Sequence, residues 1–131
     1  MGRCTVLVSV GLLVASMAPR IAVAASGSPP PSSLSCGPPT TSQSDAPPVG
    51  SSATYDAANA GSAQVAHSDT MTLRVVSTGP RPGWRGDAIY PAGQMVKVVF
   101  YDTTKRGSQV RLTVSLDGSG RYVHVRVVTC T

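Results

Sequence analysis

Apolar and polar residues alternate with a period of two over most of the chain after His67, a spacing typical of β-strands with one buried face. These segments are rich in Val and Thr, and Gly, Pro and Asp separate them as turn formers. A further short strand is expected at 88–90, before Pro91. The residues expected on buried faces are Met71, Leu73 and Val75; Val96, Val98 and Phe100; Val110, Leu112, Val114 and Leu116; and Val123, Val125 and Val127. The pattern predicts an all-β domain, a small antiparallel β-sandwich.

The last two strands are expected to form a hairpin with a two-residue turn at Gly118–Ser119. Closing the hairpin there, with Leu116 opposite Arg121, puts every apolar residue of both strands on one side. On the other side this register sets Arg111 directly across from Arg126, and like charges in that position cost free energy. The arginine pair is therefore a candidate binding surface for an anionic partner. The alternative is a solvated face whose charges discourage aggregation.

Two segments upstream give a weaker pattern. Residues 25–52 are rich in Pro, Ser, Thr and Gly and contain few large apolar side chains. Such a segment cannot bury enough surface to offset its ordering entropy, so a disordered N-terminal arm is expected before a domain at 53–131. Within 55–66, alanine content favours a short helix, whereas the alternation of Ala63 and Val65 favours an edge strand. Both readings stay open at this point.

The first 24 residues have the features of a secretory signal peptide: a basic start, an apolar run over Cys4–Ala18 and small residues before Ala25. Pro19 interrupts the apolar run before it reaches the roughly 20 residues that a membrane span needs. The protein is therefore expected to be secreted, or associated with the cell envelope, with no membrane span after cleavage. In an oxidising compartment, the two remaining cysteines, Cys36 and Cys130, are predicted to form a disulfide.

Charge and residue types argue against several function classes. The net charge is +5, and all six acidic residues are Asp. This balance allows contact with anionic polymers but falls short of the dense basic stripe of a nucleic-acid binder. Without Glu, acid–base catalysis would depend on scattered Asp residues in expected turns (87, 102 and 117), and no serine-nucleophile elbow is present. His67 is expected in a connection and His124 on an outward face, so the sequence predicts no enzyme, no cofactor and no metal site.

Two stretches carry a resemblance to a known family. Residues 90–98 read Tyr-Pro-Ala-Gly-Gln-Met-Val-Lys-Val, and 117–122 read Asp-Gly-Ser-Gly-Arg-Tyr. This combination resembles bacterial immunoglobulin-like modules, which often run Pro-x-Gly-Gln into a Val-alternating strand and later place an Asp-Gly turn before a Tyr-led strand. The chain lacks the Trp that lies between two core cysteines in true immunoglobulin domains. The resemblance implies a sandwich that presents loops or a face to partners, with no catalytic residues to carry over.

The second candidate binding surface is the loop predicted at 79–87, where Trp84, the only tryptophan, stands among Arg81 and Arg85. A rigid aromatic beside guanidinium groups suits a sugar ring, an anionic glycan or a protein hot spot. The alternative is that Trp84 folds back and caps one end of the sandwich. Residues 85–87 also spell the integrin-binding tripeptide Arg-Gly-Asp, which ordinary turn chemistry explains as well.

Together these features predict a secreted, non-catalytic binding or adhesion module at the cell envelope. Its expected partner is an envelope polymer, such as an anionic glycan, or an extracellular protein. The first alternative is a secreted inhibitor or effector that inserts the Trp84 loop into another protein. A small hydrolase is the third reading.

Overall fold

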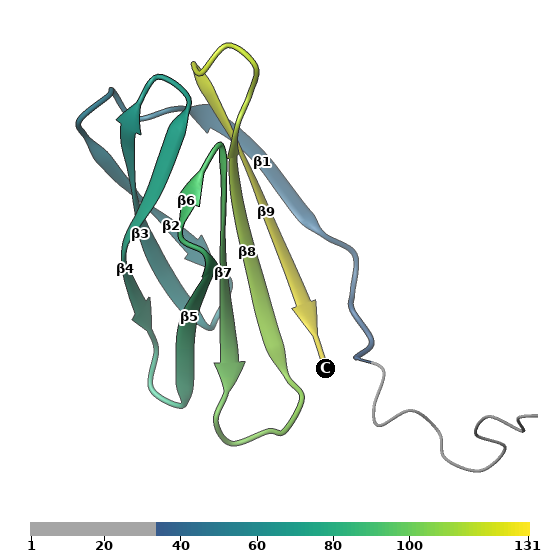
Figure 1. The fold of residues 1–131 in the computed structure, drawn as a ribbon. Helices are drawn as coiled ribbons and strands as arrows, with labels where there is room; N and C mark the ends of the chain where they lie inside the picture. The colour runs from purple at the N-terminus through teal and green to yellow at the C-terminus, as the bar shows by residue number, and fades with distance from the viewer. Residues whose placement is uncertain (1–33) are drawn as a thin grey trace, which may run out of the picture.

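A computed structural model describes residues 34–131, which fold into nine β-strands arranged in two antiparallel sheets (Figure 1). One sheet has the strand order β1-β9-β8-β7-β5 and the other β2-β3-β4-β6. The predicted all-β sandwich is confirmed. The strands are β1 (Thr40–Asp45), β2 (Ser52–Ala57), β3 (Gly61–Asp69), β4 (Thr72–Pro80), β5 (Trp84–Tyr90), β6 (Ala92–Gly93), β7 (Met95–Asp102), β8 (Gln109–Leu116) and β9 (Tyr122–Cys130). The expected signal peptide lies outside the described residues. No helix within 34–131 could span a membrane.

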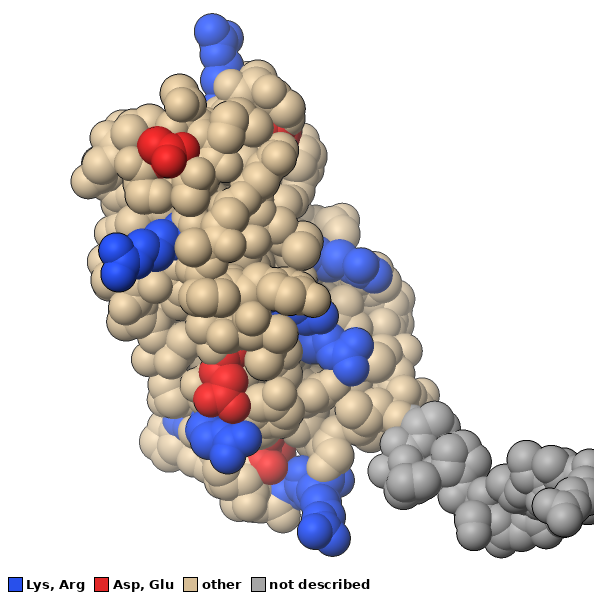
Figure 2. All heavy atoms as spheres, viewed as in Figure 1, with Lys and Arg blue, Asp and Glu red and all other residues tan. Residues whose placement is uncertain are grey.

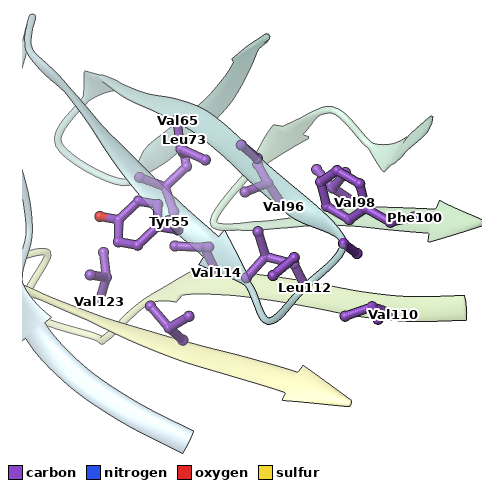
Figure 3. Packing of buried hydrophobic residues seen from close by; sticks show 14 of the residues in the cluster. Tyr55, Val65, Leu73, Val96, Val98, Phe100, Val110, Leu112, Val114 and Val123 are labelled. Carbon is purple, nitrogen blue, oxygen red and sulfur yellow. The ribbon is translucent and has the colours of Figure 1, made fainter. Parts of the chain in front are cut away.

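The core lies between the two sheets and is built from the alternating apolar residues (Figure 3). Phe100 is fully buried in this cluster, as are valines of β7 and β8 that are at most 1% exposed. Leu73 closes the core from the opposite sheet. Of the residues expected on buried faces, Met71 is the exception, because it lies in the turn before β4 and is 36% exposed.

The open question at 55–66 is settled in favour of strands. The segment forms the hairpin of β2 and β3, with Tyr55 opposite Ala63. The same alternation extends to His67, which lies within β3 and is 3% exposed, so its expected place in a surface connection was wrong. Its Nδ1 lies 2.7 Å from the carbonyl oxygen of Pro47, and its Nε2 lies 3.3 Å from that of Thr70. The imidazole thus joins β3 to two neighbouring loops.

The expected disordered arm differs from the structure in its second half. Residues 40–45 form β1, which pairs along its whole length with β9, from Thr40 opposite Val127 to Asp45 opposite Tyr122. All six side chains of β1 are exposed, so the strand is held by its backbone pairing and needs no apolar burial. Composition alone could not detect such a strand. Residues 25–33 of the expected arm lie outside the described range.

The predicted disulfide between Cys36 and Cys130 is confirmed. It joins the segment before β1 to the last residue of β9, where Cys130 is fully buried. Backbone hydrogen bonds reinforce this junction: Ser35 N donates to Thr131 O at 3.1 Å, and Thr131 N donates to Ser35 O at 2.9 Å. The start of the described chain is therefore fixed to the end of the five-stranded sheet (Figure 1).

The hairpin of β8 and β9 forms as predicted, but its register and turn were wrong. Leu116 lies opposite Val123, and the connection is longer than two residues. Gly120, at φ +71°, takes the left-handed conformation, and its N–H donates to the carbonyl oxygen of Asp117 at 3.1 Å. A side chain there would also meet Thr70 O, only 2.6 Å from an added Cβ. Because the register differs by two residues, every side chain keeps its predicted face.

Candidate functional site

The outer face of the five-stranded sheet gathers cationic side chains from three neighbouring strands. Lys97 of β7 and Arg126 of β9 both lie opposite Thr113 of β8, so they share one row across the sheet. Arg111 of β8 lies two residues from Thr113 and points to the same face. We call Lys97, Arg111 and Arg126 the cationic face. Figure 2 shows blue groups over β8 and β9 that have no red group beside them in this view.

The two arginines singled out by the sequence share this face but are not directly opposite. Arg111 lies across from Val128, and Arg126 lies across from Thr113, which makes the two arginines diagonal neighbours. Diagonal Cβ atoms lie about 7–8 Å apart, compared with about 5 Å for directly opposed residues, so the repulsion is smaller than predicted. With its amide oxygen turned towards Arg111, Gln109 accepts a hydrogen bond from Nε at 2.9 Å, which orients that guanidinium.

At the β5 side of the face, charge is locally compensated. Arg85 forms an ion pair with Asp87 at 3.3 Å and lies over the ring of Tyr101, 5.1 Å from its centroid. This is the only ion pair among residues 34–131. Both partners are well exposed, so the pair contributes little to stability. Because the charge of Arg85 is compensated by Asp87, the cationic face is the main positive region of this sheet. Its three basic residues have no acidic partner in the described chain.

An apolar residue lies beneath these charges. Val99 points to the outer face, yet it is only 5% exposed. Its cross-strand neighbours are Asp87 on one side and Arg111 on the other. Long basic side chains commonly cover apolar surface with their aliphatic stems while the charged ends stay in water. The face therefore includes one buried apolar residue beside Arg111.

A shallow hollow of ≈ 400 Å³ opens beside Arg126, over β1, β9 and β8. Hydroxyl, amide and imidazole groups surround the single guanidinium, so the hollow offers hydrogen bonds together with one positive charge. Its lining residues are Thr41, Ser42, Gln43, Thr113, Ser115, His124, Val125 and Arg126. Thr41 and Gln43 were not among the predicted site residues, because their composition placed them in the expected arm. Nothing in their composition marks them as a wall of this hollow.

The predicted recognition loop around Trp84 does not exist in that form. The turn is shorter than expected, and Trp84 is already the first residue of β5, with its N–H donating to Arg81 O at 2.9 Å. Trp84 is partly buried and packs against the core. Arg85 points to the opposite face because side chains alternate along a strand. The structure thus places Trp84 and Arg85 on opposite faces of β5 and agrees with the alternative that Trp84 caps one end of the sandwich.

The Arg-Gly-Asp tripeptide lies inside β5 rather than in a turn, so the expected turn position of Asp87 was also wrong. A Cβ added to Gly86 would lie 3.1 Å from Phe100 Cε1 and 3.2 Å from Thr78 Cβ. Close packing on Phe100 therefore explains why residue 86 is a glycine. The residues on either side of it, Arg85 and Asp87, form the ion pair.

Of the other two aspartates expected in turns, Asp117 lies in the connection between β8 and β9, whereas Asp102 is the last residue of β7; local hydrogen bonds occupy both carboxylates. The Thr104 hydroxyl, 2.7 Å from Asp102 Oδ1, is the main cause that lowers the pKa of Asp102. The Ser119 hydroxyl, at 2.8 Å, likewise lowers the pKa of Asp117. The lowered pKa values keep both carboxyl groups ionised at neutral pH. Among the described residues, no three His, Cys, Asp or Glu side chains gather to hold a metal ion.

The fold and this site define a class, a disulfide-linked β-sandwich with one cationic sheet face. Comparisons with family models, with curated proteins and with solved structures found no match to the chain.

Proposed function

We propose that the chain is a secreted, non-catalytic binding module that attaches to an anionic polymer of the cell envelope through the cationic face. The observation that carries the proposal is that Lys97, Arg111 and Arg126 share one sheet face and have no acidic partner among residues 34–131. The disulfide is compatible with an extracellular location. A sandwich that presents a face to partners is also what the resemblance to bacterial immunoglobulin-like modules implies.

The geometry of the face supports a polymer better than a compact ligand. Lys97 and Arg126 are two strands apart, which places their backbones roughly 9–10 Å from one another at ordinary strand spacing. The face is open, and the adjoining hollow offers hydrogen-bonding groups for a sugar ring next to Arg126. An extended chain with repeated negative charges can contact these points in succession. Its binding should weaken with salt, because exposed charges are screened within about 10 Å at 0.1 M salt.

The inhibitor hypothesis has less support, because it requires an exposed Trp84. That side chain packs against the core. Arg81 in the turn and Arg85 in β5 are both exposed, but the hypothesis depended on an exposed Trp84 beside them.

Neutralising the cationic face is expected to weaken binding to dextran sulfate, used as a defined polyanion. Arg126→Gln, Arg111→Gln and Lys97→Gln should each cost about 1 kcal/mol, or roughly a fivefold rise in Kd, at low salt. The measurement is calorimetric titration at two salt concentrations. Neutral dextran tests whether charge is required.

Arg74→Gln is the matched control, because Arg74 is an exposed arginine of β4 in the opposite sheet. It should leave the affinity nearly unchanged. If all four variants lose affinity equally, binding depends on net charge alone and the assignment to this face is wrong.

A further inference from the structure

Strand β1 ends the five-stranded sheet and leaves one side of its backbone unpaired. Ala46 N donates to Arg121 O at 2.8 Å, which continues the register of Asp45 opposite Tyr122. In an antiparallel ladder, alternate residues bond to the same neighbour, so the even-numbered residues of β1 bond to β9. The N–H and C=O groups of Thr41, Gln43 and Asp45 therefore point to the free edge.

This edge lacks several of the devices that usually prevent strand pairing. Five of its six residues are uncharged, and its register with β9 has no irregularity. By contrast, β5 at the other end of the sheet has a register shift at Ala88/Tyr90, and the four-stranded sheet ends beside β4 in β6, which is only two residues long. Prolines at 38–39 and 47–48 flank β1 and confine any pairing to the strand itself.

The edge of β2 is also regular, but it is less accessible. A hollow of ≈ 380 Å³ separates β1 from β2 and is lined by both strands, including Ser42, Ser44 and Thr54. A strand added beside β2 would have to enter this hollow beneath β1. The side chains of β1 are exposed on both faces, so a strand added beside β1 meets no such obstruction.

We propose that a second copy of this chain pairs antiparallel with β1 about a twofold axis at Gln43. Both partners must offer N–H and C=O groups that point to the free edge, and in β1 these belong to the odd-numbered residues. A pairing centred on Gln43 uses all three of these residues. Thr41 then faces Asp45 of the partner subunit, and the two Gln43 side chains face each other. About six backbone hydrogen bonds form, and no two like charges are directly opposed. The result is a ten-stranded sheet that runs through the dimer.

The twofold axis is perpendicular to the sheet, so both cationic faces lie on the same side of the dimer. Arg126 lies opposite Thr41, so the two Arg126 backbones are three strand spacings (roughly 14 Å) apart across the sheet and four residues (roughly 14 Å) apart along it, or roughly 20 Å in all. Gln43 of the partner subunit also extends the wall of the hollow beside Arg126. This consequence rests on the proposed function: a polyanion that spans both faces binds the dimer more tightly and favours its formation.

Sedimentation equilibrium of the purified protein, without polyanion, tests the pairing directly. The parent should show a monomer–dimer equilibrium. Gln43→Lys and Gln43→Glu should each raise the dimer Kd about fivefold or more, because like charges then meet at the axis. An equimolar mixture of the two variants should recover association at least to the parent level, which also shows that both are folded. Thr54→Lys on β2 is the matched control and should leave the Kd unchanged.

A parent protein that stays monomeric up to millimolar concentration overturns the proposal. So does a mixture that associates no better than the single variants, or a loss of association in Thr54→Lys alone. Binding of dextran sulfate to the parent is measured separately. A monomer that binds the polyanion would disprove the pairing only, whereas a dimer that ignores the polyanion would disprove only the proposed function.

Discussion

The double variant Cys36→Ala/Cys130→Ala is expected to lose about 4 kcal/mol of unfolding free energy, on a chain-entropy estimate of about 4–5 kcal/mol for so long a loop. The bridged residues are 94 positions apart. Small domains have a total stability of about 5–15 kcal/mol, so this loss is a large share. Urea titration at constant pH measures it, and the thermal midpoint should fall by more than about 15 °C.

The stability lost with the disulfide should be unevenly distributed among the strands. Strand β1 buries no side chain and depends on β9 and the disulfide, so its amides should lose protection from hydrogen exchange before those of β7 and β8. Parent protein treated with a reductant serves as the control and should behave like the double variant. An unchanged urea midpoint in both would show that the bridge contributes nothing to stability.

Trp84→Ala is expected to lower stability by about 3 kcal/mol, near the lower end of the range for truncating a large aromatic that packs on a core. Trp84 lies partly buried against the core cluster at the start of β5. At a temperature where the variant is folded, its affinity for dextran sulfate should match that of the parent. Thermal denaturation followed by calorimetric titration measures both quantities on one sample.

Tyr122→Ala provides the matched aromatic control, because Tyr122 is 40% exposed at the start of β9. Its loss should change stability by no more than about 0.5 kcal/mol. A Trp84→Ala protein that melts like the parent but no longer binds would restore the original recognition-loop hypothesis. It would also remove the reason for preferring the cationic face.

The faces of the central strands could be predicted from the sequence because period-two alternation assigns each side chain to a side. The same property explains why the register of β8 and β9 could not be predicted from the sequence. A shift of two residues leaves Leu112 and Val125 on the buried face, so the apolar pattern is identical in both registers. Only the left-handed conformation at Gly120, together with its close approach to Thr70, distinguishes them. That approach depends on tertiary structure.

The candidate site was predicted in part for similar reasons. Arg111 and Arg126 could be placed on one face by alternation alone. Strand β1 was missed because its residues are all polar, and pairing through the backbone leaves no trace in hydrophobicity. The position of Trp84 within a strand could have been predicted. Trp84, Gly86 and Ala88 lie on one face of β5, of which only residues 88–90 were expected to form a strand. Extending that strand backwards would have separated Trp84 from Arg85.

Amide chemical shifts recorded while dextran sulfate is titrated into labelled protein test the central claim most directly. The account predicts that the largest changes occur at Lys97, Arg111 and Arg126, grow with polyanion concentration and disappear at high salt. Arg74 and Gln64, on the opposite sheet, should hardly move. Changes centred on that sheet or on the turn before Trp84, or spread evenly over all basic residues, would contradict the assignment of binding to the outer face of the five-stranded sheet.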